Sequence, residues 1–530
     1  MYRSGHLDSF ARDNLPPVAE WPELVFTLPE LRYPERMNCA AELVDGHLAS
    51  GRGERVAVVA PGLRWSYREL AERIDRICNV LVGECGMAPG HRVLLRAANT
   101  PMMVACYFAV LKAGGIVVAS MPLLRARELG FMVGKARIAL ALCDERLAEE
   151  MERVGAPGLR VVYFDALEAM MARAAPGFVA CDTAQDDVCL IAFTSGTTGV
   201  PKGTMHFHRD ILAVCDTFSR HVLRPSAEDL FLGSAPVAFT FGLGGSVLFP
   251  FRMGAAALLV ERTSPADMLA AIGRYRPSIL FTAPTTYRFM LTQLDGADFS
   301  SLRKCVSAGE ALPKATWEAW RAATGLALID GIGGTEMLHI FISAAGEDIR
   351  PGATGRAVPG FEARVVDEAG RAVAAGVLGR LAVRGPTGCR YLDDARQTRF
   401  VQHGWNLTGD TFTMDGDGYF WYGARSDDMI VSSGYNIAGP EVEQALLGHE
   451  AVLECAVVGV PDAQRGQVVR AHVVLREGFE PSEAMTAALQ AHVRGAIAPY
   501  KYPRAIAYAT ALPRTETGKV QRFKLREVQA

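Results

Sequence analysis

The chain of 530 residues lacks the features that mark several specialised classes of protein. Its eleven cysteines form no CxxC pair, and their odd number and wide spacing indicate reduced thiols, so we expect a cytoplasmic protein. Neither sign of charge dominates, because 55 Lys and Arg stand against 58 Asp and Glu for a net charge of −3. Nucleic acids and anionic membranes attract clustered positive charge, so we expect neither as a partner.

The chain also lacks a long uninterrupted hydrophobic run. The longest apolar segment, Cys106–Leu124, contains Lys112 and is broken by Gly114-Gly115 and Pro122. A helix that spans a bilayer needs about 20 consecutive apolar residues. The first residues, Met1–Pro17, carry charges where a signal peptide needs an apolar stretch. We therefore expect a core helix followed by a buried strand, and no membrane anchor.

What the sequence does have is ample apolar content, with 50% hydrophobic residues, and a regular alternation of short β-rich runs and helical segments. Examples in chain order are Arg55–Val59, Tyr67–Val82, His91–Leu95, Met102–Ala113 and Gly115–Ala119. Apolar strands separated by helices predict parallel sheets that are covered on both faces. The predicted fold class is α/β, with a large N-terminal region of doubly wound sheets and helices.

The pattern changes after about Gly376, where short strands separated by Gly and Asp turns predict a small β-rich lobe. From Ser432 a compact α+β module follows, with helices predicted at Pro440–Leu447 and Ser482–Ala496. The polar run Arg425–Asp428 lies between these regions. We place the boundary there, which divides the chain into residues 1–426 and 427–530.

A loop rich in hydroxyl residues and glycine follows the predicted strand Leu190–Phe193. Its sequence is TSGTTGVPKG, and its candidate ligand groups are Thr194, Ser195, Gly196, Thr197, Thr198, Gly199 and Lys202. Backbone N–H groups, hydroxyls and a lysine suit a polyphosphate. The alternative is an ordinary solvated turn, and Pro201 excludes a Walker loop because it replaces that motif's second glycine.

The order of residues in this loop closely resembles the phosphate loop of the adenylate-forming superfamily, which includes acyl-CoA synthetases, luciferases and adenylation domains. Further segments that resemble this superfamily follow in its order, and they are Ser307–Glu310, Gly331–Glu336, Thr408–Asp410, Arg425–Asp428 and Pro513–Lys519. Two departures are the loss of the usual tyrosine-glycine start before Thr335 and Ala424 before the hinge motif. The resemblance covers roughly residues 40–530.

The resemblance implies sites for ATP, Mg²⁺ and coenzyme A. Glu336 would hold Mg²⁺, Asp410 and Arg425 would bind ribose, and the other expected nucleotide contacts are Gly309, Glu310, Gly331, Ile332 and Gly333. The implied catalytic residues are Lys202, Thr335, Glu336 and Lys519. Each has a plainer alternative, because a lone carboxylate or a tail lysine is more often solvated than functional.

The implied reaction has two steps. A carboxylate attacks the α-phosphate of ATP to give an acyl-adenylate and pyrophosphate, and a thiol then displaces AMP. In this superfamily the small C-terminal domain is mobile and rotates between the steps, which removes the lysine and opens a pantetheine tunnel. Asp427 takes the hinge position, and Ser433, Gly434 and Tyr435 resemble the loop brought to the tunnel. A homodimer stays open, because family members are often dimers.

The acyl pocket is expected around the aromatic turn Ala238–Gly244 and the segment Glu336–Phe341. The latter resembles benzoate-type aryl-CoA ligases, in which the residues at the positions of His339 and Ile340 line the ring. The full expected set is Phe239, Thr240, Phe241, Gly333, His339 and Ile340. We interpret Gly333 as leaving room for a flat ring. Met205–Asp210 and Ser432–Glu443 look most like the 2-aminobenzoate branch, with Thr240 as the candidate partner of the amine.

Other readings remain open. The chain resembles, less closely, a stand-alone adenylation enzyme that loads a carrier-protein thiol, and the acid could be a hydroxybenzoate, a fluorobenzoate or a small aliphatic acid. A luciferase-type monooxygenase and a silent binding protein are the alternatives of another class. A silent protein fits poorly with the joint presence of Lys202, Glu336, Asp410, Arg425 and Lys519.

Overall fold

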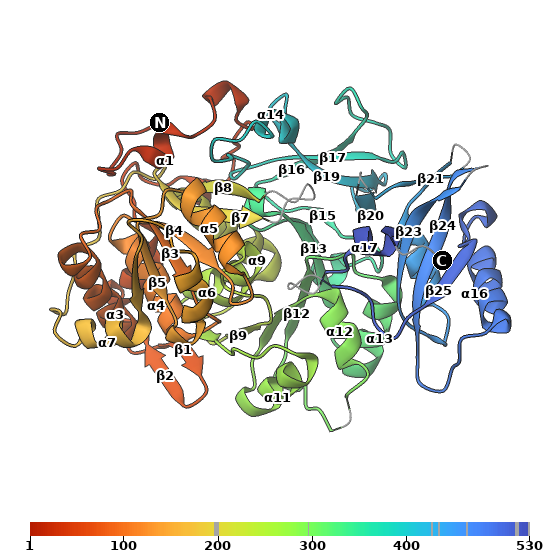
Figure 1. Cartoon of the computed structure of the whole chain (residues 1–530), viewed down its shortest axis with the longest axis horizontal. Helices are drawn as coiled ribbons and strands as arrows, with labels where there is room; N and C mark the ends of the chain where they lie inside the picture. The colour runs from red at the N-terminus through yellow and green to blue at the C-terminus, as the bar shows by residue number, and fades with distance from the viewer. Residues whose placement is uncertain are drawn as a thin grey trace.

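Two mixed sheets form the larger part of the molecule, which a computed structural model describes for residues 1–194, 201–294, 296–425, 428–432, 435–462, 465–514 and 519–527. Over these residues the first sheet has the order β6-β5-β3-β4-β7-β8 and the second the order β15-β14-β13-β12-β11-β9-β10-β1-β2 (Figure 1). The strands of the first sheet are β3 Arg92–Arg96, β4 Ile116–Ser120, β5 Leu140–Cys143, β6 Arg160–Tyr163, β7 Val188–Thr194 and β8 Lys202–Phe207. Those of the second are β1 Val56–Ala60, β2 Leu63–Ser66, β9 Leu230–Gly233, β10 Ala256–Leu258, β11 Ile279–Thr282, β12 Lys304–Ala308, β13 Leu328–Gly333, β14 Ile340–Ser343 and β15 Arg356–Ala357.

Helices cover both faces of each sheet. One core lies between the two sheets and contains the apolar side chains of α3 Tyr67–Asn79 and α4 Pro101–Lys112. The outer face of the first sheet packs against α5 Ala126–Lys135 and α6 Ala148–Arg153, and that of the second against α11 Pro265–Tyr275, α12 Pro284–Met290 and α13 Lys314–Thr324. The remaining helices of this region are α1 Phe10–Asp13, α2 Gly46–Ala49, α7 Phe164–Met171, α8 His208–Val214, α9 Thr240–Leu243 and α10 Phe249–Met253.

The apolar segment Cys106–Leu124 forms the end of α4 and the whole of β4, as its pattern predicts. Helix α4 begins after Thr100, whose side chain accepts the N–H of Met103, and nearly all of its residues are buried between the sheets. The one charge in this segment, Lys112, is neutralised by Asp45 and Asp75, whose oxygens lie 2.9 and 2.5 Å from its Nζ. Among the described residues, no helix is long and apolar enough to cross a membrane.

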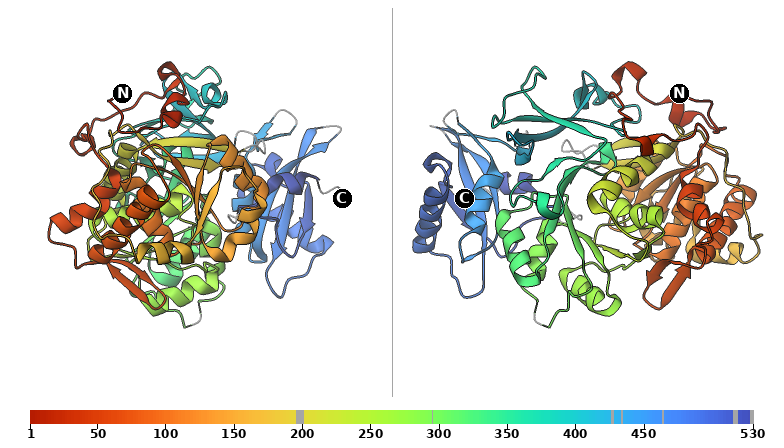
Figure 2. Two further views of the ribbon diagram at one scale, coloured as in Figure 1. Left: turned by 60° about the vertical axis from the view of Figure 1, so that its left-hand side comes forward. Right: turned by 180° about the vertical axis from the view of Figure 1, so that it is seen from behind.

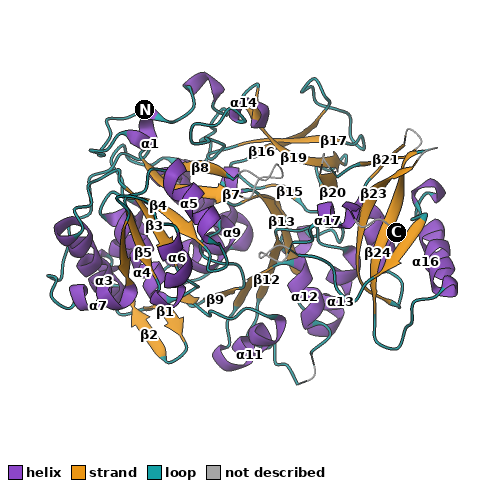
Figure 3. Cartoon of the chain, in the orientation of Figure 1, coloured by secondary structure: helices purple, strands orange, loops and turns teal. Residues whose placement is uncertain are grey.

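Two β-rich units complete the molecule. An antiparallel sheet of β16 Glu362–Val366, β17 Gly379–Arg384, β18 Val401–Gln402, β19 Trp405–Met414 and β20 Phe420–Arg425, with α14 Gln397–Phe400 beside it, lies across one edge (Figure 3). The blue lobe at the far end holds β21 Ile430–Ser432, β22 Tyr435–Ile437, β23 Val452–Asp462, β24 Gly466–Leu475 and β25 Ala505–Tyr508 (Figure 2). Its helices are α15 Gly439–Leu447, α16 Glu483–Ala496 and α17 Arg522–Glu527.

The structure differs from the sequence prediction in three places. The sheets are not wholly parallel, because β8 pairs antiparallel with β7 and β14 pairs antiparallel with β13. The β-rich lobe begins earlier than Gly376, since β16 already belongs to its sheet. The predicted helix Tyr67–Val82 ends as an α-helix at Asn79 and continues as a wider turn. The division at residues 426 and 427 stays a prediction, because both lie outside the described residues.

Candidate active site

The predicted phosphate loop joins two strands of a hairpin. β7 and β8 pair antiparallel, with Thr194 opposite Lys202, so the loop begins and ends at one edge of the first sheet. Ser195, Gly196, Thr197, Thr198 and Gly199 lie outside the described residues. The strand pairing nevertheless fixes both ends of the loop, and the side chain of Lys202 lies beside it.

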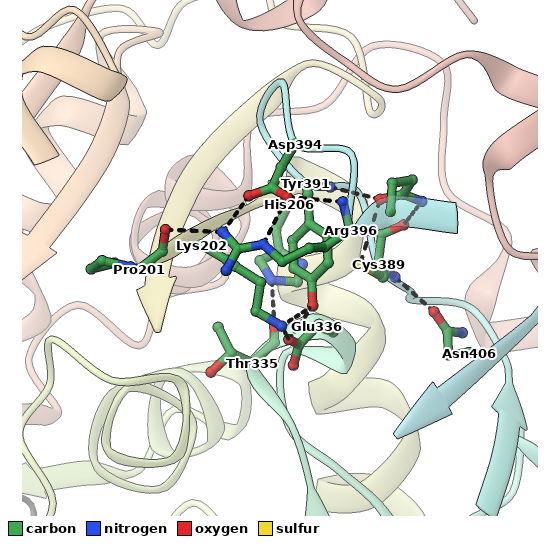
Figure 4. A network of polar contacts seen from close by, with 11 residues as sticks. Pro201, Lys202, His206, Thr335, Glu336, Cys389, Tyr391, Asp394, Arg396 and Asn406 are labelled. Carbon is green, nitrogen blue, oxygen red and sulfur yellow. Dashed lines mark hydrogen bonds and ion pairs between the residues drawn. The ribbon is translucent and has the colours of Figure 1, made fainter. Parts of the chain in front are cut away.

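Lys202, Tyr391 and Glu336 are joined by two hydrogen bonds and an ion pair, which we call the phosphate-side network (Figure 4). The Tyr391 hydroxyl donates to Glu336 Oε1 at 2.6 Å and accepts from Lys202 Nζ at 2.9 Å. Lys202 Nζ lies 3.7 Å from the same carboxylate oxygen. Burial, reinforced by the Glu336 charge, raises the pKa of Tyr391, so its hydroxyl stays protonated and can bridge the two charges.

The hairpin is tied to this network by buried polar contacts. His206, on β8, has its Nε2 2.8 Å from the carbonyl oxygen of Thr335, which fixes the backbone just before Glu336. Asp210 lies 3.7 Å from His206 Nδ1 and also pairs with Arg390, and these three side chains are almost wholly buried. Because Arg390 immediately precedes Tyr391, this pairing positions the tyrosine. The segment around Tyr391 also pairs with β8 through backbone hydrogen bonds.

The site can hold a hard cation. Glu336 is 13% exposed, so its carboxylate is fixed by neighbours yet open on one side, and Lys202 is 20% exposed. Mg²⁺ usually takes one or two protein carboxylates and fills its remaining positions with phosphate oxygens and water. A single carboxylate beside a phosphate loop fits that pattern.

On the nucleotide side, the predicted residues lie at the ends of β12 and β13, which run parallel with Ala308 opposite Gly331. Gly309 follows β12 with a φ of +91°, a conformation that favours glycine. The Glu310 carboxylate accepts hydrogen bonds from the hydroxyl and N–H of Thr285, at 2.6 and 3.3 Å. Adjacent parallel strands thus bring these segments to one edge of the second sheet.

Asp410, Arg425 and Lys519 meet on the other side of the site. Asp410 and Arg425 are paired across β19 and β20, and Arg425 Nη1 lies 3.4 Å from the Asp410 carboxylate. Burial raises the pKa of Asp410, while the charges of Arg425 and Lys519 oppose that rise. Lys519 is exposed, and its charge acts on the Asp410 carboxyl.

The expected acyl residues surround a buried histidine. The rings of Phe218, Phe241, Phe249 and Phe281 lie within 6.4 Å of the His339 ring, centroid to centroid. Burial lowers the pKa of His339 to about 3, so the imidazole is neutral at physiological pH. Its Nε2 lies 3.4 Å from the Phe241 carbonyl oxygen, and its Nδ1 has no hydrogen-bond partner among the described residues.

The structure explains the glycine at position 333 by backbone packing and not by space for a substrate ring. A Cβ at Gly333 would lie 2.6 Å from the carbonyl oxygen of His339, so the chain itself fills the space that we assigned to an aromatic ring. The glycine is needed because two backbone segments touch there. Ile340 is likewise buried and packs against Gly331, where a Cβ would lie 2.8 Å from its side chain. Phe239 and Thr240 stand at the start of α9, half-buried.

Three predicted hinge and thiol-channel residues, Asp427, Ser433 and Gly434, lie outside the described residues, and Tyr435 begins β22. Two further side chains carry no signal in the sequence. Tyr391 follows a β-strand in a loop and carries no motif signal, and only the fold brings it to Glu336. Asp330 precedes Gly331 in β13, and burial raises its pKa to about 8.

Comparisons with known proteins match this chain over most of its length. The profile of the AMP-binding enzyme family matches residues 47–390, and that of the AMP-binding enzyme C-terminal domain matches residues 441–519. The benzoate–CoA ligase of Thauera aromatica is 36% identical over 94% of this chain and 98% of its own length.

Solved structures match equally well. The anthranilate CoA ligase AuaEII in complex with anthranoyl-AMP superposes with a TM-score of 0.90 at 34% identity, covering 94% of this chain and 98% of that one. A benzoate CoA ligase from Burkholderia xenovorans LB400 gives a TM-score of 0.86 at 33% identity, covering 93% and 100%.

Proposed function

The chain belongs to the AMP-binding enzyme family, and from that premise we propose that it is an ATP-dependent aryl-CoA ligase. It activates an aromatic carboxylate through an acyl-adenylate, with release of pyrophosphate, and then forms the coenzyme A thioester with release of AMP. The observation that carries the proposal is the presence of the phosphate-side network, the Asp410–Arg425 pair and the aromatic cluster around His339 in a chain that aligns end to end with such ligases.

In the first step, the carboxylate of the acid attacks the α-phosphate of ATP. Lys202 binds the phosphate chain from the end of its loop, and Lys519 approaches from the Asp410 side, so the reacting oxygens lie between two cations. Fixed positive charge stabilises the negative charge that grows in such a transition state. Mg²⁺ held by Glu336 would neutralise the triphosphate oxygens when it is bound. Thr335 presents Glu336, because His206 fixes its carbonyl.

In the second step, Lys519 must leave, so that a thiol can reach the acyl carbon. We assign this movement to rotation of the C-terminal lobe about Asp427, with the segment from Ser433 to Tyr435 approaching the site. A hinge of this kind needs only a few backbone angles to change.

We also expect a homodimer, which light scattering of the purified protein checks.

The residues around His339 favour an acid with a flat, uncharged ring. Four phenylalanine rings and an uncharged imidazole form an apolar cluster that suits contact with a benzene ring. Within that class we propose 2-aminobenzoate as the preferred acid. If Nε2 of His339 donates to the Phe241 carbonyl, its buried Nδ1 is an unused acceptor that suits an ortho-amine.

Pyrophosphate release tests the activity. The purified chain is assayed with benzoate, 2-aminobenzoate, hydroxybenzoates and short aliphatic acids, with and without coenzyme A. We expect aromatic acids to be turned over and their thioesters to appear only with coenzyme A. Absence of turnover with every benzoate would reject the aryl assignment, and transfer to a carrier-protein thiol but not to coenzyme A would favour the stand-alone adenylation enzyme.

A matched pair of variants tests the choice of ring substituent. His339→Gln keeps a donor near the Nε2 position and removes the acceptor at Nδ1, whereas His339→Asn keeps a polar atom near Nδ1. Leaving a buried polar group without its hydrogen bond costs about 1–3 kcal/mol. The glutamine variant should therefore lose roughly tenfold of any preference for 2-aminobenzoate over benzoate. An unchanged ratio of kcat/KM in both variants would remove His339 from that role.

A further inference from the structure

Three ligand-type side chains meet in the core behind the phosphate loop. They are Cys39, Cys189 and His208, and one ligand atom from each lies within 4.8 Å of the others. All three residues are 0% exposed. They play no part in the proposed reaction. We call them the Cys₂His cluster.

The cluster joins segments that are far apart in the sequence. Cys39 belongs to the N-terminal segment before α2, Cys189 lies on β7, and His208 is the first residue of α8, directly after β8. The hairpin of β7 and β8 therefore carries the phosphate loop at one end and two members of the cluster near the other. Anything that links the three side chains fixes the N-terminal segment to the base of that hairpin.

The histidine has the protonation that a metal ligand requires. His208 Nδ1 accepts the backbone N–H of Cys39 at 3.2 Å and lies 3.1 Å from Cys39 Sγ. Nδ1 therefore carries the lone pair of the neutral ring and the proton is on Nε2, which has no partner among the described residues, so an ion bound at Nδ1 would take the place of the Cys39 N–H. A neutral imidazole nitrogen and thiolates are the forms that bind metal.

A further observation indicates a ligand for this cluster. The hydroxyl of Tyr107 is buried near the two thiols and has no hydrogen-bond partner among the described residues. A buried hydroxyl without a partner costs about 1–3 kcal/mol, which a metal or a thiolate beside it would offset.

We propose that Cys39, Cys189 and His208 bind a divalent zinc-type ion, with the Tyr107 oxygen at the fourth position. Two thiolates balance the two positive charges of the ion, so the occupied cluster is neutral in a core that tolerates no net charge. Thiolate and imidazole ligands favour Zn²⁺ over Mg²⁺ or Ca²⁺, which prefer oxygen ligands. The role is structural, because no substrate can approach residues that are 0% exposed.

The ion must enter while the chain folds, so the test uses protein made in the presence of metal. Full-length protein is expressed in zinc-supplemented medium, and its metal content is measured by mass spectrometry. We expect about one zinc per chain in the unaltered protein, and the same in Cys305→Ala, which removes a buried thiol from a different core. The double variant Cys39→Ala, Cys189→Ala should contain almost none.

A second measurement does not depend on whether that variant folds. Unaltered protein expressed with cobalt in place of zinc should show the thiolate-to-cobalt charge-transfer absorption, which Cys305→Ala retains. Tyr107→Phe should keep the metal and release it several-fold faster to a chelator, and an unchanged release rate would remove Tyr107 from the fourth position. No charge-transfer absorption, together with a zinc content no higher than that of the double variant, would leave only a hydrogen-bonded thiol and imidazole and would overturn the proposal.

Discussion

At the scale of single residues, the Tyr391 hydroxyl holds a cation and a carboxylate at one point of the site. Tyr391→Phe keeps the ring and removes both hydrogen bonds, so Lys202 and Glu336 lose their common partner. Hydrogen bonds to charged groups are worth about 1.5–3 kcal/mol, which predicts a loss of roughly 10- to 100-fold in kcat/KM for MgATP. Steady-state kinetics with varied MgATP measure it.

The control for this prediction is Tyr287→Phe, which removes a buried hydroxyl that bonds to the Val306 carbonyl away from the site. It should lower the melting temperature and leave kcat/KM for MgATP almost unchanged. Equal kinetic losses in the two variants would assign Tyr391 a purely structural role.

Lys519 is expected to serve the first half-reaction alone. Its ammonium acts near Asp410 in this arrangement of the lobes, and the thioester step requires that it move away. Lys519→Ala should therefore reduce adenylate formation by about 100-fold or more, which is the usual size of losing one transition-state contact. Thioester formation from supplied acyl-adenylate should be nearly intact, and parallel loss of both half-reactions would contradict the role.

At the scale of elements, the apolar pattern of the sequence indicated where helices and strands lie, and local capping and packing explain their positions. α11 begins at Pro265 because Ser264 caps its first turn and proline suits the first helical position, and its apolar side chains face one core. The positions of β3 and β4 followed from apolar runs whose residues are almost all buried. Strand β8, the antiparallel partner of β7, was not predicted. Its direction depends on the connection between the two strands, which the residues of β8 themselves do not indicate.

The candidate site was predictable where a motif encodes it and not where packing creates it. Glu336 and Lys202 were identified because each stands in a recognisable segment. Tyr391 could not be, because 55 residues separate it from Glu336 and only pairing of its loop with β8 brings them together. Gly333 was predicted to leave room for a substrate ring, whereas the fold needs a glycine there because the His339 backbone lies against it. No sequence pattern reveals that close approach.

Strand β13 carries a carboxyl group that should make stability depend on pH. Burial raises the pKa of Asp330 to about 8, above the unfolded value of about 4, so the folded chain holds a proton that the unfolded chain loses. The stability that this proton confers is complete below about pH 4 and is lost as the pH rises through about 8. Asp330→Asn does not titrate, and its melting temperature should exceed that of the unaltered protein increasingly between pH 5 and 8.

Differential scanning fluorimetry across this pH range measures the effect, with the exposed Asp348→Asn as the control. The control should follow the unaltered protein at every pH. A constant difference between Asp330→Asn and the unaltered protein would mean that Asp330 is ionised in the folded state.

At the scale of the whole molecule, an ion cluster connects the two parts that carry the site. Glu454, on β23 of the C-terminal lobe, is 4% exposed and pairs with Arg514 of the same lobe and, at 3.4 Å, with Arg288 on α12. Arg514 also lies 3.9 Å from Glu310, beside the predicted nucleotide site. One buried carboxylate thus holds two arginines together across the lobes, in the arrangement that places Lys519 near Asp410.

Glu454→Gln removes the charge that holds this arrangement. Breaking a buried ion pair at one partner costs about 3–5 kcal/mol, because Arg288 and Arg514 then lose the carboxylate that lies between them. The lobe should then favour other orientations, so adenylation should slow at least tenfold while thioester formation from supplied acyl-adenylate is unchanged or faster. Pyrophosphate release and thioester formation, measured separately, decide this, with the exposed Glu450→Gln as the matched control. Equal slowing of both half-reactions would mean that the cluster stabilises the fold without selecting the orientation of the lobe.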